Sequence, residues 1–146
     1  MKQHTENFYF KRLKEITIQE SDEINELILS SFQNSRINHY DNLVYYKYKN
    51  RIIGFAGLYF IDKYLSINQL CVHKDFRNQG IATQILEFIE KLYKYISMIL
   101  YIDKNKNNTD YLYKFYTQRG FKEIDYLKTF NLTYNKDDEY LLIKDG

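Results

Sequence analysis

The residue types best suited to chemistry gather where an apolar run gives way to a helix-like run, in the segment from Leu70 to Thr83. Its loop reads Arg-x-x-Gly-x-Ala, with Arg77, Gly80 and Ala82 at the named positions. The first N–H groups of a helix have no intrahelical acceptor and lie at the positive end of the helix dipole, so anions bind there. Gly80 and Ala82 leave the main chain accessible, and the guanidinium of Arg77 can add donors. The spacing therefore predicts a site for a phosphate or diphosphate group.

A strand before the loop and a helix after it must position these residues. Residues 64–72 ahead of the loop and 98–102 further on are apolar runs typical of strands. Apolar residues at helical spacing predict a helix over residues 80–95, with one buried face formed by Ile81, Ile85, Leu86, Ile89 and Leu92. The order strand, helix, strand makes a βαβ unit, with the loop at the carboxyl end of its first strand, where open α/β sheets bind ligands.

The N-terminal half supplies further elements. Alternating apolar residues predict a strand over residues 13–18, and residues 34–41 are polar and irregular. Residues 43–49 and 52–60 predict an antiparallel hairpin with a tight turn at Asn50 and Arg51. Ser21 predicts an N-cap, supported by acidic residues behind it, for a helix that carries Ile24, Leu27, Ile28 and Phe32.

The C-terminal third predicts a helix followed by a last pair of strands. Thr109 or an adjacent Asn caps the helix, which runs to Arg119 and ends at Gly120 because glycine accepts the left-handed conformation there. Residues 121–130 and 140–143 supply the strands.

Two motifs in this order resemble those of the GCN5-related N-acetyltransferases, the GNAT family. The loop resembles the family's acetyl-CoA signature, Gln/Arg-x-x-Gly-x-Gly/Ala, and residues 113–121 are similar to its later motif of an aromatic residue and Tyr, three residues, then Gly-Phe. The resemblance extends over nearly the whole chain. It implies a single domain over residues 1–146 of the α/β class, with a mixed, largely antiparallel twisted sheet of six to seven strands flanked by about four helices, the acyl-CoA N-acyltransferase fold.

The resemblance also implies acetyl-CoA as co-substrate, with no metal. The pantetheine arm would pair with the main chain at Leu70, Cys71 and Val72. Asn108 lies one residue ahead of the family's asparagine position, which Thr109 occupies, and offers a further CoA contact. The diphosphate would lie on the loop and contact Arg77, Asn78, Gln79, Gly80, Ile81, Ala82 and Thr83.

Acetyl transfer needs a neutral amine to attack the thioester and a proton for the departing thiolate. Tyr116 stands at the family's tyrosine position, and a phenol with an ordinary pKa near ~10 is protonated at neutral pH, so Tyr116 is the predicted general acid. Tyr111 and Tyr113 are the alternatives. Where some members carry a glutamate base, this chain has Ser66 and Asn68. A water chain held by these side chains or by main-chain carbonyls, or an amine that arrives partly neutral, would take its place.

The remaining residues of reactive type, a cysteine, a histidine and three aspartates, are better explained by structural roles. Strand alternation directs Cys71 away from the face shared by its neighbours, and no basic partner is fixed beside it, so a small buried hydrophobe is favoured. His73 begins a polar loop at the end of the strand. Residues 32–46 and 126–140 would line the acceptor pocket, and their carboxylates, at Asp41, Asp137 and Asp138, are typical of solvated surface.

Composition indicates a globular protein. The 146 residues are 45% hydrophobic and 27% charged, and a single cysteine excludes an internal disulfide and a cysteine-based zinc cluster. The 21 basic and 19 acidic residues give a net charge of +2, which argues against a large nucleic-acid surface. No run is long and apolar enough for a signal peptide or a membrane span, so a soluble cytoplasmic protein is expected.

The leading hypothesis is an N-acetyltransferase that moves an acetyl group from acetyl-CoA to a primary amine, on a small molecule or a protein, by direct attack. Two alternatives stay open. One is a CoA-binding regulatory or interaction domain without turnover, which the missing carboxylate would allow. The other is a toxin-like acetyltransferase acting on aminoacyl-tRNA, which would favour a more basic surface. Oligomeric state is also open, with a homodimer as the commonest soluble assembly.

Overall fold

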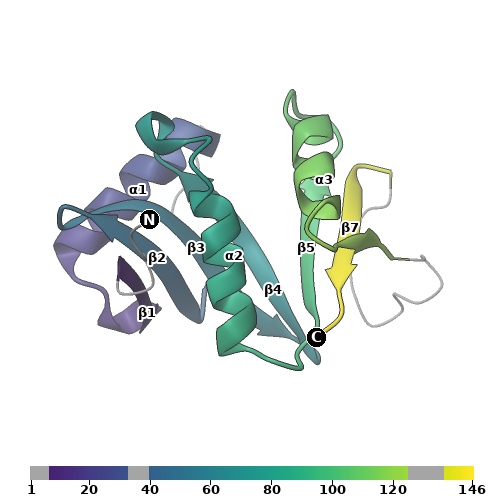
Figure 1. Ribbon diagram of the computed structural model, residues 1–146, viewed down its shortest axis with the longest axis horizontal. Coiled ribbons are helices and arrows are strands. Elements are labelled where there is room, and N and C mark those ends of the chain that lie inside the picture. Colours follow the sequence, from purple (N-terminus) through teal and green to yellow (C-terminus); the bar gives the residue numbers. More distant parts are fainter. Residues whose placement is uncertain (1–6, 33–39, 125–136) are drawn as a thin grey trace. The chain divides into compact units, whose positions relative to one another are not determined.

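The computed structural model describes residues 7–32, 40–124 and 137–146. The strands follow the hydrogen-bonded order β1-β2-β3-β4-β5-β7-β6 in a seven-stranded sheet. This confirms the predicted mixed α/β fold, although the described residues contain three α-helices where about four were expected. The strands are β1 (Phe8–Arg12), β2 (Asn42–Tyr48), β3 (Arg51–Ile61), β4 (Tyr64–Val72), β5 (Met98–Asp103), β6 (Lys122–Glu123) and β7 (Glu139–Lys144), and the helices are α1 (Ile18–Phe32), α2 (Ile81–Leu92) and α3 (Thr109–Thr117) (Figure 1).

The chain divides into two compact units, and β4 contributes to both. The first unit comprises Met1–Tyr59 and Ile67–Lys94, and so holds β1, β2, most of β3, α1, α2 and the end of β4. The second comprises Phe60–Ser66 and Tyr95–Gly146, and so holds the start of β4 with β5, β6, β7 and α3. The single domain expected over residues 1–146 stays a prediction.

In the first unit, β1, β2 and β3 form an antiparallel meander, which confirms the predicted hairpin. Ile24 and Ile28 of α1 are fully buried in a cluster with Tyr45 of β2 and Phe55 of β3, which stand opposite each other in the ladder. This cluster, which also contains Leu27, confirms three of the four residues predicted for the apolar face of the first helix, and the side chain of Phe32 lies outside the described residues; the cluster places α1 on one face of the strands.

Helix α2 covers the other face of the same strands. Gly54, next to Phe55 on β3, faces this helix: a Cβ at Gly54 would lie 3.1 Å from Cδ1 of Ile85 and 3.3 Å from Cγ2 of Ile81. Successive residues of a strand point to opposite faces, so α1 and α2 lie on opposite sides. Both faces are therefore covered, which explains why β2 and β3 are buried along most of their length.

In the second unit, β7 lies between β5 and β6 and pairs antiparallel with each. The start of β4 pairs parallel with β5, with Leu65 opposite Met98 and Ser66 opposite Ile99. Helix α3 contacts β5. Because β4 and β5 are parallel and α2 lies between them in the sequence, the predicted βαβ connection is confirmed.

The start of the first helix differs from the prediction. Leu13–Glu15 form a 3₁₀ turn, so a strand over residues 13–18 is wrong, and the strand lies earlier as β1. Ser21 is inside α1, and Thr17 caps it: the N–H of Glu20 donates to Oγ1 of Thr17 at 3.0 Å, and the N–H of Thr17 donates to Oε1 of Glu20 at 2.9 Å. This reciprocal capping box satisfies two N–H groups at once and begins the helix about a turn before Ser21.

Smaller differences concern turns and helix ends. Lys49 and Asn50 have φ values of 49° and 64°, so the hairpin turn is centred one residue before the predicted pair. Helix α2 ends at Leu92, which is 44% exposed and outside the buried face, and α3 ends before Arg119. Much of the predicted acceptor-pocket lining and of the strand over residues 121–130 lies outside the described residues, which omit 33–39 and 125–136. In the described part of the chain, no helix has the length and apolar character to cross a membrane.

Candidate functional site

The predicted phosphate loop lies in the first unit, between β4 and α2. Asn78 and Gly80 have φ values of 64° and 81°, so the main chain turns through the left-handed region just before the helix. The N–H of Gln84 donates to the carbonyl of Gly80 at 3.0 Å, which is the first hydrogen bond of the helix. The N–H groups of Ile81 and Ala82 precede this bond and have no acceptor within the helix. The loop can therefore offer main-chain donors to an anion.

Gly80 keeps the main chain accessible. It caps α2 with a left-handed backbone, which glycine adopts without steric cost. A Cβ added at Gly80 would meet no other atom within 4 Å, so the space beside it is open. Asn78 and Gln79 are also exposed. A phosphate group can approach the loop from this open side.

Helix α2 is held in place by the apolar face that the sequence predicted. Four of its side chains are buried against the first unit, and they are Ile81, Ile85, Leu86 and Ile89. The absence of a side chain at Gly54 allows this helix to lie close to β3. The helix start is therefore fixed by packing before any ligand binds.

Arg77 connects the loop to neighbouring elements. Its Nε donates to the carbonyl of Val72 at 3.0 Å, and its Nη2 contacts Oγ of Ser31 at 3.3 Å. These bonds attach the loop to the end of β4 and to α1. The expected contact between Arg77 and a diphosphate stays a prediction.

The end of β4 contains a feature that the sequence did not reveal. Gln69 has a φ of 55°, a left-handed conformation within a strand. Nothing about glutamine favours this conformation. Such a residue interrupts the regular alternation of the strand close to Leu70, and a main-chain N–H is a group that can stabilise a developing oxyanion.

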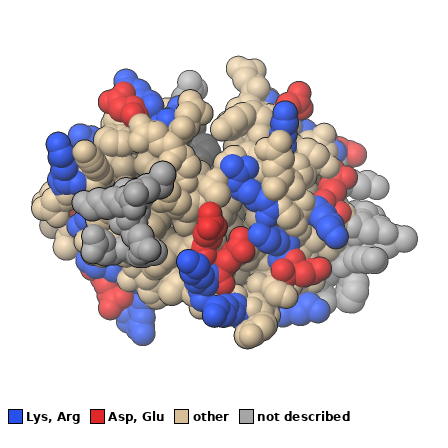
Figure 2. All heavy atoms as spheres, in the orientation of Figure 1, with Lys and Arg blue, Asp and Glu red and all other residues tan. Residues whose placement is uncertain are grey.

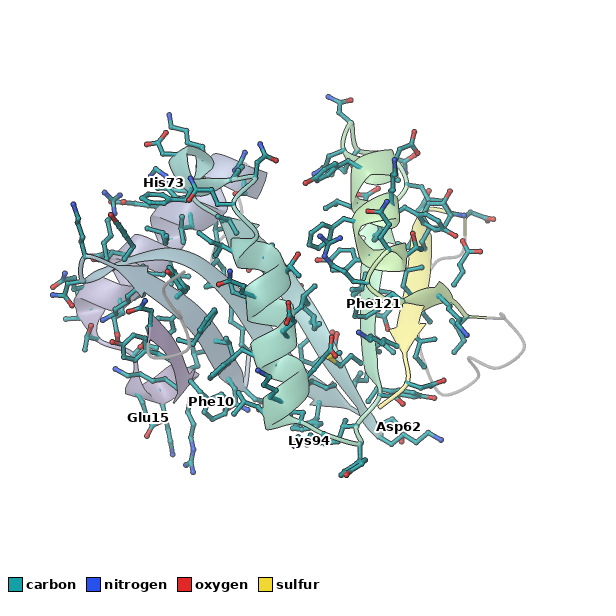
Figure 3. The ribbon with its side chains drawn as sticks, viewed as in Figure 1. Phe10, Glu15, Asp62, His73, Lys94 and Phe121 are labelled. Carbon is teal, nitrogen blue, oxygen red and sulfur yellow. The ribbon has the colours of Figure 1, made fainter. Side chains whose placement is uncertain are left out.

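Cys71 and His73 have structural surroundings, as expected. Cys71 is 6% exposed within the core cluster of the first unit. Burial raises the pKa of its thiol to about 12, against the opposing effects of a hydrogen bond with Ser31 and the charge of Arg77. The thiol is therefore protonated at neutral pH and is a poor nucleophile. Nδ1 of His73, labelled in Figure 3, accepts a hydrogen bond from the N–H of Asp75 at 3.1 Å and caps the short turn after β4.

Tyr116 lies in the second unit, near the end of α3, and is 7% exposed. The N–H of Gly120 donates to the carbonyl of Thr117 and the N–H of Phe121 to that of Tyr116, both at 3.2 Å, while Gly120 has a φ of 96°. This is the Schellman arrangement that closes a helix. The rings of Tyr116 and Phe121 meet edge to face with centroids 5.5 Å apart (Phe121 is labelled in Figure 3). The Tyr-x-x-x-Gly-Phe spacing therefore fixes the position of the Tyr116 ring.

The other predicted residues of α3 lie in different surroundings. Asn108 is the N-cap position, but its side chain makes no capping hydrogen bond within the described structure. Thr109 closes the preceding loop by donating to the carbonyl of Asp103 at 2.5 Å. Burial, with the charges of neighbouring side chains, raises the pKa of Tyr113. Tyr111 is 63% exposed.

The hydroxyl of Ser66 stands at one of the two strand positions where the resemblance implies a base. Ser66 is 1% exposed, and its Oγ has no hydrogen-bond partner among the described residues. A buried hydroxyl normally has a partner, so this one is suited to hold a water molecule. Asn68 on the same strand is half-buried.

The described part of the chain holds one buried carboxylate, Glu20. It accepts hydrogen bonds from the hydroxyl of Tyr45 at 2.6 Å and from Nζ of Lys11 at 3.0 Å, and Nζ of Lys47 lies 3.3 Å away. Burial by itself would raise its pKa, but these contacts and the N–H of Thr17 bring the pKa down to about 2. An acid held this firmly in its ionised form is too weak a base for chemistry near neutral pH.

Charges and metal-ligating residues do not point to other chemistry. On the face drawn in Figure 2, Lys and Arg are interspersed with Asp and Glu. Across residues 7–32, 40–124 and 137–146, no three His, Cys, Asp or Glu side chains gather to hold a metal ion. The candidate groups are therefore the loop before α2, the end of β4 near Gln69, and Tyr116.

Comparisons with known proteins agree with this geometry. A family model described as "Acetyltransferase (GNAT) domain" matches residues 39–123. An aminoglycoside 6′-N-acetyltransferase complexed with coenzyme A is similar in structure, with a TM-score of 0.73 and 14% identity over 94% of this chain and 96% of that chain. An acetyltransferase from Streptococcus agalactiae has a TM-score of 0.70 and 13% identity, over 96% of this chain and 99% of that chain.

A third similar structure is Arabidopsis thaliana Naa50 in complex with the bisubstrate analogue CoA-Ac-MVNAL. Its TM-score is 0.66 at 15% identity, over 96% of this chain and 99% of that chain. At these identities the solved structures establish the fold alone. No curated protein sequence matches the chain.

Proposed function

The chain belongs to the GNAT family of acetyl-CoA-dependent N-acetyltransferases, and on this premise we propose that it moves the acetyl group to a primary amine by direct attack, with Tyr116 as the general acid. The observation that carries the proposal is the loop before α2. It combines a left-handed glycine, an open space and helix N–H groups without intrahelical acceptors. This combination suits the diphosphate of CoA, with donors from residues 78–83.

The proposed reaction has one nucleophilic step. The lone pair of the neutral amine attacks the thioester carbonyl carbon, so a C–N bond forms and the C–S bond breaks. Main-chain N–H groups near the left-handed Gln69 stabilise the oxyanion. Tyr116 gives its proton to the CoA thiolate, and the proton lost by the amine passes to water.

The proposed route for that second proton uses Ser66. Its buried, unpartnered hydroxyl can hold the first water of a chain, and Asn68 is the other candidate on the strand. Neither side chain accepts a proton usefully at neutral pH, so the water chain carries the proton to solvent. An amine that binds already neutral does not need the water chain to remove a proton before it attacks the thioester.

The acceptor class follows from the family chemistry. Among the similar structures, one enzyme is named for 6′-N-acetylation of aminoglycosides, and another holds an analogue that joins CoA, an acetyl group and the sequence MVNAL. We propose a primary amine on a small molecule or a protein. A cytoplasmic location, where acetyl-CoA is available, belongs to the same proposal.

A thiol-release assay tests this function. The purified protein is incubated with acetyl-CoA and a panel of primary amines, including polyamines, an aminoglycoside and peptides with free N-termini. Free CoA is measured with a chromogenic disulfide, and the protein's own thiol adds little background because Cys71 is buried. An alcohol of matched shape serves as the control for each amine. Amine-dependent CoA release with an acetylated product is expected, whereas release that is independent of every amine would contradict the proposal.

A further inference from the structure

A serine continues the buried stripe of α1 at the C-terminal end of the helix. Ser31 follows Leu27 by four residues and Ile28 by three, so it lies on the side of α1 that packs on the strands. Ser31 is half-buried, whereas Ser30 beside it is exposed. A polar side chain on a core-facing stripe needs hydrogen-bond partners, and its partners show what the position does.

The partners of Ser31 belong to the end of β4 and to the loop before α2. Its Oγ accepts a hydrogen bond from Nη2 of Arg77 at 3.3 Å. The same hydroxyl forms a hydrogen bond with the buried thiol of Cys71 on β4. A serine hydroxyl accepts and donates at the same time, so both bonds can exist together. Ser31 therefore connects α1 with the strand and the loop, all within the first unit.

These contacts fix the guanidinium of an otherwise flexible side chain. Nε of Arg77 donates to the carbonyl of Val72 at 3.0 Å, so the group is held at two of its nitrogen atoms. A guanidinium is planar and rigid, so fixing Nε and Nη2 also fixes the direction of Nη1. Nη1 has no acceptor among the described residues and stays available for an anion.

We propose that Ser31 is a positioning residue for acetyl-CoA, which orients the guanidinium of Arg77 toward the diphosphate before the co-substrate binds. A side chain that is ordered in advance loses less conformational entropy on binding, so the affinity rises without a new contact to the ligand. Ser31 acts in this way only through Arg77. The assignment rests on the proposed function, and it gives α1 a part in co-substrate binding that lies outside both sequence motifs.

A double-mutant cycle measured by calorimetric titration with acetyl-CoA tests this role. The proteins are the wild type, Ser31→Ala, Arg77→Ala and the double variant. We expect Ser31→Ala to weaken binding about three- to tenfold, the size of effect that the loss of one hydrogen bond produces. In the Arg77→Ala background the same change should alter the affinity less than about twofold, because the side chain that Ser31 orients is gone.

Ser31→Thr and Ser30→Ala are the matched variants. Threonine keeps the hydroxyl, so Ser31→Thr should bind acetyl-CoA within about twofold of the wild type. Oγ of Ser30 donates to the carbonyl of Leu27 at 2.9 Å, within its own helix, so Ser30→Ala should leave the affinity unchanged. Steady-state kinetics adds a second readout: Ser31→Ala should raise KM for acetyl-CoA and leave kcat unchanged, which a general loss of folded protein would not do.

The outcomes separate this role from the proposed function. Unchanged affinity in Ser31→Ala overturns the positioning role while the proposed function stands. Losses that add in the double variant, or an equal loss in Ser31→Thr and Ser31→Ala, do the same. A folded wild-type protein that does not bind acetyl-CoA overturns both. Circular dichroism of each variant establishes that it is folded.

Discussion

Tyr116 has a structural role that its ring contact shows and a catalytic role that we propose. Its ring packs against Phe121 in the closure of α3, and its hydroxyl is the proposed proton donor. The ring contact accounts for the burial of the residue without any catalytic role. The two roles can be separated, because phenylalanine preserves the ring and removes only the hydroxyl.

Tyr116→Phe should keep the fold and lose most of the activity. We expect kcat to fall about 10²- to 10⁴-fold, the usual contribution of general acid–base catalysis, with little change in KM for acetyl-CoA. Steady-state kinetics with thermal unfolding measures both effects. Tyr113→Phe is the control and should leave kcat unchanged. Full activity in Tyr116→Phe, or a loss that appears in Tyr113→Phe instead, would contradict the assignment.

For single residues, residue type predicted where glycines are needed, but it did not predict unusual backbone conformations or side-chain hydrogen bonds. Gly120 was identified because a left-handed backbone at a helix end favours glycine, and Gly80 because it leaves the main chain accessible; both have positive φ values. The left-handed Gln69 could not be predicted, since nothing about glutamine favours this conformation. The bonds of Arg77 to Val72 and Ser31 were equally hidden, because they depend on how a distant helix packs.

At the element scale, the beginning of α1 shows where pattern reading failed. Thr17-x-x-Glu20 is a complete capping box in the sequence. Ser21 is followed three residues later by Ile24, whose side chain cannot accept a hydrogen bond from the N–H of Ser21. The sequence therefore did contain the capping box that marks the start of α1. Strand β1 was harder to find, because its residues Phe8–Arg12 are mostly half-buried or exposed, and pairing with β2 stabilises it.

Glu20 should make the stability of the protein depend on pH. Its pKa is about 2 in the folded protein against an ordinary 4.5, so it contributes stability above pH 4.5 that is lost as pH falls toward 2. A difference of this size corresponds to about 3 kcal/mol. Glu20→Gln should be less stable than the wild type at pH 7, and the gap should narrow as pH falls from 4.5 toward 2. Urea unfolding at several pH values measures this.

A matched control is Glu26→Gln, which removes a carboxylate from the same helix. Glu26 pairs with Arg51 at 3.1 Å, but both side chains are more than half exposed, so little change in stability is expected. If the free energy of unfolding changed with pH in the same way for the wild type and Glu20→Gln, the contacts of Glu20 would not be lowering its pKa, and the prediction would be wrong.

At the scale of the whole molecule, the fold class was predictable and the division into two units was not. The fold was implied by the resemblance of two motifs to a known family, and the strands and helices predicted between the motifs from their periodicity were consistent with it. The division falls within β3 and β4, at Tyr59 and Ser66, where strand residues continue without a linker. Composition marks linkers, so it could not mark this boundary.

The central claim is that the loop before α2 binds the diphosphate of acetyl-CoA, and calorimetric titration with acetyl-CoA tests it most directly. Three proteins are compared: the wild type, Gly80→Glu and Gly80→Gln. Both substitutions put an L-residue of the same size at a φ of 81°, with similar backbone strain, and they differ only in charge. Circular dichroism first establishes that all three are folded.

We predict saturable binding by the wild type and weaker binding by both variants. Gly80→Glu should bind at least about tenfold more weakly than Gly80→Gln, because its carboxylate repels the diphosphate at the helix start. A folded wild-type protein that does not bind acetyl-CoA, or equal affinities for the two variants, would contradict the account.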